Sequence, residues 1–553
     1  MTVKDNIINF LKSKNYPDEN IEKIFKKAPD FNKNIIEYLI DIEKIEEDEI
    51  LKFFSKEYNI PIKEPLVPIE KKESYYVVFK DGDIGIFFPA NKKILLSKNI
   101  PEEKIKLIPY SLIKESKNED IQGIRGIIID LIKQTKEKKA TDIHFESKEY
   151  GAVIKIRLLG ELVEIAKYEK DIAFKILRVI KHMAADYTPG FDPEEYNEVQ
   201  DARIELPNLN LGIRISFAPS IYDYDSSKRM QNFVIRLLNK EKRKVKGVEE
   251  LYKLGYEKED AEVLIKNSKL KNGLIIMSGA TGSGKSLTFN TLLALLSPKL
   301  KILSAEDPVE YALDNAVQHQ ILEFTKKVGG QDKIIHVGYM DYMRGFMRQD
   351  PDVIFIGEWR KNPELTESLV YASETGHLVY TTLHSSRVVN VANLLITQYG
   401  LKPEDLENNV NLIINQRLVK KICPYCSIEH TVVSEEIEDI KSLIRFKDKN
   451  KLDSLIGKTI KKVNPNGCEH CIIKDAKGEI LSAGYIGRTA IYEYLEFDEE
   501  VRATISETTS TRKIEDILIK KIEEKKAKSF VDTSMKKVED KIIDLTQLKQ
   551  GLL

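Results

Sequence analysis

The sequence predicts a multidomain α/β protein whose largest domain, residues 243–420, contains a mostly parallel sheet. Three observations support this prediction: a length of 553 residues, strand and helix signals that alternate within 243–420, and a glycine-rich turn directly after an apolar run. A chain of this length is expected to form several domains, since one domain usually holds ~100–200 residues. Alternating strands and helices are typical of a parallel sheet covered by helices.

The N-terminal domain is expected over residues 1–115. Its apolar residues recur at helical spacing to about residue 65, and Pro61 and Pro65 end this helical part. Strand-like runs follow at 75–79 and 84–88. A small mixed α/β part therefore completes this domain.

A second domain is expected over residues 118–240, between two polar stretches that are typical of linkers. The first stretch, 116–120, precedes a long amphipathic helix from Ile121, and the second, 240–246, is dense in charge. Strands of this domain are expected at 142–145, 153–157 and 211–216. At the other end of the chain, residues 481–553 are expected to form a C-terminal helical domain.

All four cysteines fall within residues 421–480, as the pairs Cys423/Cys426 and Cys468/Cys471. Two C-x-x-C pairs about 40 residues apart suit tetrahedral zinc, because each short loop directs two thiolates at one metal. Redox-active or idle thiols are the alternative. A closed Cys₄ shell leaves no open ligand position, so zinc would hold a small module together rather than do chemistry.

Residues 279–286 read Gly-Ala-Thr-Gly-Ser-Gly-Lys-Ser and follow the apolar run 273–277. Glycines let the backbone N–H groups point inward at phosphate oxygens, and the start of a helix adds positive field. Lys285 would reach the β- and γ-phosphates, and the Ser286 hydroxyl would ligate Mg²⁺. A Gly/Ser turn could match by chance, but the strand before and the helix after favour a site for a nucleoside triphosphate. The expected contacts are Gly279, Ala280, Thr281, Gly282, Ser283, Gly284, Lys285, Ser286 and Leu287.

Acidic residues follow two further predicted strands. The strand 353–356 leads to Glu358, and an acid at the carboxyl end of a parallel strand can orient or deprotonate the attacking water. Glu358 is the candidate general base, and a solvated acid is the alternative. The strand 301–304 leads to carboxylates that suit Mg²⁺ bound through water, with the last also a catalytic candidate: Glu306, Asp307 and Glu310.

Two histidines and two arginines complete the candidates. His384 lies at the end of an expected strand, where it could sense the γ-phosphate or join subunits, and His377 is the weaker candidate. A lone histidine is more often structural. Arg344 and Arg348 lie one turn apart on an expected helix, where they could neutralise phosphate charge, although exposed arginines mostly aid solubility.

The overall composition excludes little. Lys plus Arg (87) balances Asp plus Glu (88), so no global basic field indicates a nucleic-acid binder. No apolar run approaches the ~20 residues of a bilayer span, and the N-terminus lacks a signal-peptide core. We expect a cytoplasmic protein, unless a partner holds it at a membrane.

Four motifs in order resemble those of the secretion ATPase superfamily. Residues 279–286, 306–311, 348–358 and 375–384 match its phosphate loop, aspartate box, Walker B segment and histidine box. Over roughly residues 118–500 the chain looks like the type IV pilus assembly and type II secretion ATPases. That likeness includes 141–146, 415–418, both cysteine pairs and 484–493.

The resemblance implies a RecA-like P-loop ATPase domain at 243–420, preceded by a PAS-like domain. It implies a homohexamer that binds ATP and Mg²⁺ between neighbours. Arg203 and Arg214 match arginines of the preceding domain that reach the γ-phosphate in the family. Hydrolysis would then move that domain and turn or lift an inner-membrane platform protein. Cytoplasmic assembly proteins would be further partners, at the inner face of the cytoplasmic membrane.

Some positions depart from the family pattern. Ala202 stands where glycine is usual, the strand 155–160 lacks one arginine and an aspartate, and 326–338 lacks an expected glycine- and arginine-bearing stretch. The spacing over 34–57 follows the cyclic-di-GMP-binding domains of some relatives. We expect a docking domain instead, because other residues stand at the pocket positions: Asn34, Ile36, Glu43 and Glu57.

Several functions stay open at this point. Pilus assembly and type II secretion cannot be separated by these residues. Retraction motors are shorter and lack the cysteine module, which argues against retraction. A RecA-like nucleic-acid translocase would need a basic channel, and a regulator that no longer hydrolyses ATP would not need both Lys285 and Glu358.

Overall fold

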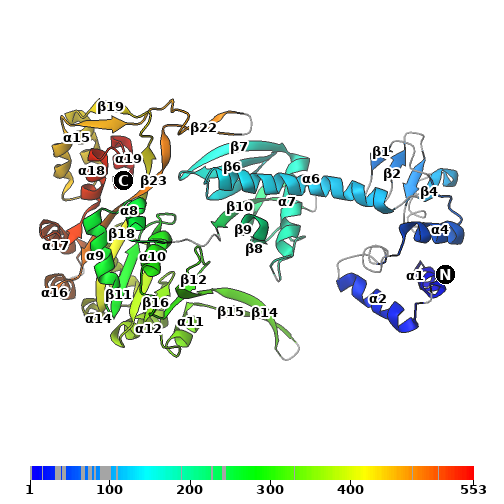
Figure 1. Ribbon diagram of the computed structural model, residues 1–553, viewed down its shortest axis with the longest axis horizontal. Helices are drawn as coiled ribbons and strands as arrows, with labels where there is room; N and C mark the ends of the chain where they lie inside the picture. The colour runs from blue at the N-terminus through cyan, green and yellow to red at the C-terminus, as the bar shows by residue number, and fades with distance from the viewer. Residues whose placement is uncertain are drawn as a thin grey trace. The chain divides into compact units, whose positions relative to one another are not determined.

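The computed structural model divides into two compact units, Met1–Asp130 and Leu131–Leu553 (Figure 1). It describes residues 3–14, 16–30, 39, 45–63, 69–72, 77–79, 83–86, 101–107, 110–188, 190–225, 228–239, 245–328, 331–475, 478–507 and 510–553. Within these ranges, no helix combines the length and the apolar character that crossing a bilayer requires.

The first unit combines short helices with a four-stranded sheet of order β1-β2-β3-β4. The helices are α1 (Val3–Ser13), α2 (Asp18–Asp30) and α4 (Glu47–Tyr58), and the strands are β1 (Ile69–Lys72), β2 (Val77–Phe79), β3 (Ile84–Ile86) and β4 (Ile105–Leu107). One apolar core contains residues from both helices and sheet, among them Phe10, Phe54 and Ile86.

Some sequence predictions for this unit fall on residues outside those described. Strands β2 and β3 match the described parts of the expected runs 75–79 and 84–88. Asn34, Ile36 and Glu43 lie outside the described residues, whereas Glu57 lies exposed on α4.

Helix α6 (Tyr110–Glu137) runs without interruption through residues 116–120. The polar linker expected there is therefore helical, and the long helix begins before Ile121. The physical reason is that this stretch contains lysine and glutamate, which favour helices, and neither proline nor glycine. Of the second expected linker, residues 240–244 lie outside the described part of the chain.

The next segment forms a six-stranded antiparallel sheet of order β7-β6-β5-β10-β9-β8, against which helix α7 (Lys170–Ala185) packs. Its buried residues alternate along the strands, for example Ile213, Ile215 and Phe217. The strands are β5 (Asp142–Lys148), β6 (Gly151–Leu158), β7 (Glu161–Glu169), β8 (Gln200–Leu206), β9 (Leu211–Asp223) and β10 (Arg229–Asn239).

The largest sheet has eight strands in the order β13-β12-β16-β17-β11-β18-β23-β24. The strands from β13 to β18 in this order are parallel, which confirms the predicted α/β fold. They are β11 (Gly273–Ser278), β12 (Ile302–Glu306), β13 (Ala316–Gln320), β16 (Val353–Ile356), β17 (Leu378–Leu383) and β18 (Val410–Ile422).

Strands β11, β12, β16 and β17 are buried at every residue. Alternate residues of β11 enter two different apolar cores, with Leu274 and Ile276 in one and Ile275 and Met277 in the other. Apolar layers therefore cover both faces of the sheet, as central parallel strands require. The helices of this region are α8 (Glu249–Leu254), α9 (Lys258–Ser268), α10 (Lys285–Ala294), α11 (Tyr339–Phe346), α12 (Pro363–Glu374), α13 (Val388–Tyr399) and α14 (Pro403–Asn409).

The segment expected as a separate C-terminal helical domain, 481–553, contributes to this same sheet. Strand β23 (Tyr485–Glu496) pairs antiparallel with β18, and β24 (Ala527–Lys528) pairs with β23. Residues 489–495 of β23 are buried at every position, so the strand belongs to the core rather than to a free module. The helices of this segment are α16 (Glu499–Glu507), α17 (Thr511–Glu523), α18 (Phe530–Glu539) and α19 (Leu545–Leu552).

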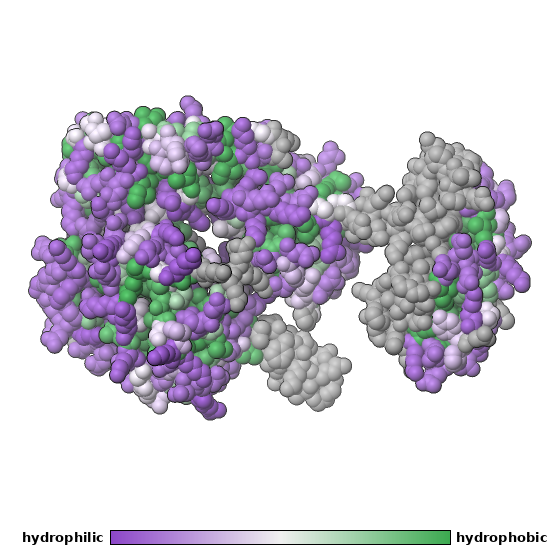
Figure 2. All heavy atoms as spheres, in the orientation of Figure 1, coloured by the Kyte–Doolittle hydropathy of each residue, from purple (hydrophilic) through white to green (hydrophobic). Residues whose placement is uncertain are grey.

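The cysteine-containing part consists of α15 (Ser434–Leu443), the short helix η3 (Lys449–Leu455) and two small hairpins. The hairpins pair β19 (Ile428–Thr431) with β20 (Thr459–Lys462) and β21 (Ile473–Lys474) with β22 (Ile480–Ser482). One apolar core joins this part to β18, β23, α18 and α19 through residues such as Ile437, Ile491 and Phe530. On the face drawn in Figure 2, hydrophilic residues predominate and hydrophobic ones lie among them in small groups.

Residues 326–338, which depart from the family pattern, belong largely to a hairpin that forms its own two-stranded sheet (Figure 1). Strand β14 (Leu322–Val328) pairs antiparallel with β15 (Gln331–Val337). The segment that departs from the family pattern therefore forms a local hairpin, which lies between β13 and α11 in the sequence.

Candidate functional site

The glycine-rich turn joins the carboxyl end of β11 to the start of α10, as the sequence predicts. Gly279, Gly282 and Gly284 have φ values of 142°, 77° and 88°, which residues with a Cβ rarely adopt. A Cβ at Gly279 would also lie 2.5 Å from the Gln416 carbonyl oxygen. The loop therefore needs glycine both for its backbone conformation and for its close approach to β18.

Lys285 is the first residue of α10 and folds back over the loop. Its Nζ donates to the carbonyl oxygens of Gly279 at 2.7 Å and Ala280 at 3.1 Å. Burial lowers the pKa of Lys285 to about 8, and the charges of Glu358 and Glu310 partly oppose that shift. The ammonium is thus held where few groups solvate it, and phosphate oxygens would supply the missing negative charge.

Glu358 follows β16 at the same edge of the sheet. Its neighbours are fixed, since Gly357 N–H donates to the Ala305 carbonyl at 2.8 Å and Trp359 N–H to the Thr382 carbonyl at 2.7 Å. Arg360 Nε donates to Glu358 Oε2 at 3.0 Å. The carboxylate therefore lies on a rigid turn, as a general base requires.

His384 follows β17 and lies between the base candidate and the phosphate loop. Its Nδ1 is 3.2 Å from the Gly279 carbonyl oxygen, and its Nε2 is 3.6 Å from Glu358 Oε1. The two ring nitrogens of His384 therefore each face an oxygen atom. The structure thus brings together Lys285, Glu358 and His384, which the sequence proposed from three separate motifs.

The two acidic residues at the end of β12, Glu306 and Asp307, have different surroundings. Glu306 is buried, accepts from Ser304 Oγ at 2.7 Å and Gln318 Nε2 at 3.0 Å, and has its pKa raised to about 7 by burial. Ser304 and Gln318 therefore hold the Glu306 carboxyl group in place within the fold. Asp307 instead accepts from Arg360 NH2 at 3.4 Å, so it lies beside the residues around Glu358.

Arg203 of β8 and Arg214 of β9 lie directly opposite each other in the antiparallel sheet. Arg203 NH2 donates to Asp307 Oδ1 at 3.2 Å, and Arg214 NH1 lies 3.8 Å from the same oxygen. Both predicted arginines therefore reach the aspartate box of their own chain. Together with Arg360, they surround one carboxylate with three guanidinium groups.

The His377 prediction does not fit this geometry. His377 precedes β17, so it lies at the amino edge of the sheet, about 20 Å along the strand from the loop. There its Nδ1 contacts the Ala372 carbonyl at 2.9 Å, which argues against nucleotide binding. Helix α11 ends at Phe346, and Arg348 follows it in a turn, where its N–H donates to the Gly345 carbonyl at 3.1 Å. Arg344 pairs with Glu364 at 3.0 Å.

Gln416 is the residue that sequence reasoning did not single out. Its Nε2 donates to the Ser283 carbonyl at 2.7 Å, and its Oε1 accepts from Tyr256 OH at 2.6 Å and Thr288 Oγ1 at 2.9 Å. The side chain is fully buried under the phosphate loop. Only the three-dimensional pairing of β11 with β18 reveals these contacts, because the partners lie 133, 160 and 128 residues from Gln416 in sequence.

The four cysteines converge on one point. The Sγ atoms of Cys423 and Cys468 and those of Cys426 and Cys471 are 3.7 Å apart, and those of Cys468 and Cys471 are 3.8 Å apart. A tetrahedral metal with bonds of about 2.3 Å to sulfur gives edges of about 3.8 Å. The cluster therefore fits zinc. Gly484 N–H also points at Cys471 Sγ, at 3.3 Å, as a donor that would stabilise a thiolate.

Replacing Gln416 with leucine should weaken ATP binding by about tenfold, because a buried carbonyl and two hydroxyls lose their partner and the loop loosens. Titration with a fluorescent ATP analogue measures this effect. Asn411→Ala is the control, since Asn411 lies on the same strand at the opposite edge of the sheet. Equal ATP affinity in the Gln416 variant and the wild type would contradict the view that Gln416 supports the phosphate loop.

Comparisons with known proteins agree with this geometry. The family model described as Type II/IV secretion system protein matches residues 117–550. The type IV pilus assembly ATPase PilB of Pseudomonas aeruginosa is 30% identical over 391 residues, which is 70% of this chain and 60% of PilB. The type II secretion system protein E of Dickeya dadantii is 30% identical over 390 residues, which is 70% of this chain and 68% of that protein.

The fold has a solved counterpart in the ATPase DotB of Legionella pneumophila. That X-ray structure superposes with a TM-score of 0.50 at 18% identity, over 77% of this chain and 95% of DotB. The likeness supports the fold alone, whereas the family match covers most of the chain. The chain belongs to the Type II/IV secretion system protein family, and it is an ATP-hydrolysing enzyme of the secretion ATPase superfamily.

Proposed function

We propose that this enzyme works as a homohexameric motor that drives type IV pilus assembly or type II protein secretion. It would act at the inner face of the cytoplasmic membrane, through an inner-membrane platform protein and cytoplasmic assembly proteins. The names of the relatives support both duties equally, since one is a pilus assembly ATPase and the other a secretion system protein.

The side chains at the carboxyl edge of the sheet suit the chemistry of ATP hydrolysis. Lys285 and the loop N–H groups would bind the phosphates, and Ser286 would hold Mg²⁺, which offsets phosphate charge. Glu358 would accept the proton of the attacking water. His384, which contacts both Glu358 and the Gly279 carbonyl, would link the base candidate to the phosphate loop. These are the roles that phosphoryl transfer requires: positioning and electrostatic stabilisation.

The single observation that carries the motor proposal is the contact of Arg203 and Arg214 with Asp307. These arginines belong to the six-stranded sheet, whereas Asp307 follows β12 beside the catalytic edge. A nucleotide phosphate would compete with Asp307 for the same guanidinium groups. Binding and hydrolysis would therefore change how strongly the two sheets are held together, which is how chemical energy becomes movement.

A nucleic-acid translocase built on the same core is the main alternative. It predicts ATP hydrolysis that DNA or RNA accelerates, whereas the proposed motor should respond to its membrane partner. Capture of the full chain's partners from detergent-solubilised membranes, with mass spectrometry, would identify a polytopic platform protein. Pilus proteins or secretion proteins among the captured partners would then distinguish the two duties.

Glu358→Gln should retain ATP binding and lower turnover by at least about a hundredfold, because the amide cannot accept the proton. Lys285→Ala should instead remove binding and turnover together, because it deletes the cation that faces the phosphates. Phosphate release and nucleotide titration, measured on both variants, separate these outcomes. Loss of binding in Glu358→Gln would mean that Glu358 serves the metal or the fold.

Combined replacement of Arg203 and Arg214 with alanine should lower kcat at least tenfold while ATP still binds, since the phosphate loop is untouched. Arg229→Ala is the control, because Arg229 is an exposed residue of the same sheet that pairs with Asp223. Light scattering with a non-hydrolysable ATP analogue tests the hexamer in parallel. Wild-type turnover in the double variant, or a persistent monomer, would refute the motor.

We also propose that the four cysteines bind one structural Zn²⁺. Elemental analysis of the purified full chain should find one zinc per chain, and Cys423→Ser should lower that ratio. Proteolysis between residues 421 and 480 should become faster in this variant, because the metal no longer closes the module. Protein without zinc that resists proteolysis equally well would exclude the site.

A further inference from the structure

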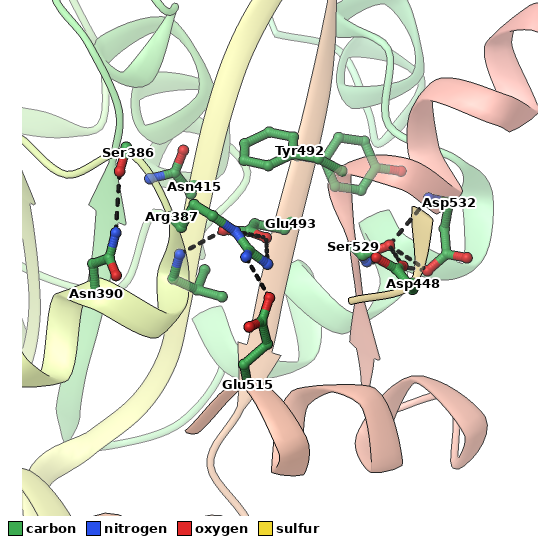
Figure 3. Close-up of polar contacts among 12 residues, drawn as sticks. Ser386, Arg387, Asn390, Asn415, Asp448, Tyr492, Glu493, Glu515, Ser529 and Asp532 are labelled. Atoms are coloured by element: carbon green, nitrogen blue, oxygen red, sulfur yellow. Dashed lines mark hydrogen bonds and ion pairs between the residues drawn. The ribbon is translucent and has the colours of Figure 1, made fainter. Parts of the chain in front are cut away.

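The loop that follows β17, residues 384–388, is anchored at every residue. His384 contacts the phosphate-loop carbonyl of Gly279, as described above. Beyond it, groups from three other elements bind the loop, and several of them are drawn in Figure 3. The anchoring groups come from β18, β23 and α17, the last two of which lie after the cysteine pairs in sequence.

Arg387 provides the strongest of these anchors. Its NH1 donates to Glu515 Oε1 at 2.6 Å, and its NH2 donates to Glu493 Oε2 at 3.2 Å (Figure 3). The Arg387 side chain is 14% exposed, and that of Glu493 is 0% exposed. Its guanidinium also lies 4.3 Å from the centre of the Phe446 ring. A buried cation between two carboxylates and an aromatic face is held in one position.

The backbone of the loop is bound as well. Glu493 Oε1 accepts from Val388 N–H at 2.6 Å, so one carboxylate holds both the side chain of Arg387 and the next backbone group. Asn415 Nδ2 donates to the Ser385 carbonyl at 2.8 Å, and Arg417 NH2 donates to the Ser386 carbonyl at 3.1 Å. The loop therefore has little freedom while these bonds persist.

Arg387 lies close in sequence to the catalytic edge. Three residues before Arg387, His384 is 3.6 Å from Glu358 and 3.2 Å from the Gly279 carbonyl. A displacement of the loop would change both distances. Proton acceptance by Glu358 depends on its neighbours' geometry, and an error of about 1 Å can cost a hundredfold in rate.

We propose that Arg387, Glu493 and Glu515, which we call the Arg387 clamp, position His384 for catalysis. Through this clamp, strand β23 and helix α17 set the turnover rate of the nucleotide site. Arg387 is a positioning residue, because it acts through His384 and touches neither phosphate-loop nor base residues. The inference rests on the proposed role of Glu358 as the general base.

The test uses Glu515→Gln and Arg387→Lys in the full chain. Glu515→Gln keeps the side chain's size but removes a charge, and Arg387→Lys loses the two-pronged contact. Both should lower kcat by about five- to tenfold with KM for ATP nearly unchanged, since the phosphate loop stays intact. The control is Asp516→Asn, on the next residue of α17, which pairs with Lys447 and is 65% exposed.

A double-variant cycle separates positioning from general destabilisation. If the clamp acts through His384, Arg387→Lys should change kcat by less than about 1.5-fold when His384 is already alanine. A merely structural clamp would lower the rate by the same factor in both backgrounds. Thermal midpoint, zinc content and ATP affinity are measured on each variant to identify misfolded protein.

Several outcomes would overturn the inference. These are full turnover in Glu515→Gln and Arg387→Lys, full turnover in His384→Ala, or effects that multiply in the double variant. A different result would show that Glu358 is not the general base. In that case Glu358→Gln would still hydrolyse ATP, whatever the clamp variants do.

Discussion

The structure depends on one constraint: parallel strands end at the same edge of their sheet. Strands β12, β16, β17 and β11 pair in parallel, so the residues that follow each of them meet at one edge of the sheet. Asp307, Glu358, His384 and the phosphate loop come from four separate strand ends. The strand pairing brings these strand ends together, and the phosphate loop additionally needs glycine at positive φ.

Charge balance at this edge explains why the parts of the site are linked. Burial lowers the pKa of Lys285 to about 8, which means that the fold holds a cation with too little solvation. Nearby, Asp307 is surrounded by three arginines. An anionic ligand would supply the negative charge that Lys285 lacks. It would also compete with Asp307 for the arginines. In the proposed motor, nucleotide binding would therefore compete with the contact between the two sheets.

The C-terminal part of the chain is integral to the enzyme. Strand β23 supplies Glu493 from the interior of the shared sheet, and α17 supplies Glu515 from outside it. Phe446, from the cysteine-containing part, covers the guanidinium of Arg387. A single buried arginine thus joins the loop after β17 to both later segments. The zinc site that we propose would therefore connect to the catalytic edge through this arginine.

The sequence by itself determined the phosphate loop, the strand ends that carry Glu358 and His384, and the two cysteine pairs. These features are local: glycine spacing, apolar runs and C-x-x-C loops act over a few residues. It could not determine that β23 belongs to the same sheet, that His377 lies at the wrong edge, or that α6 continues through its polar stretch. Gln416, the three arginines around Asp307 and the Arg387 clamp likewise needed the tertiary structure, because strand order and side-chain burial decide which distant residues touch.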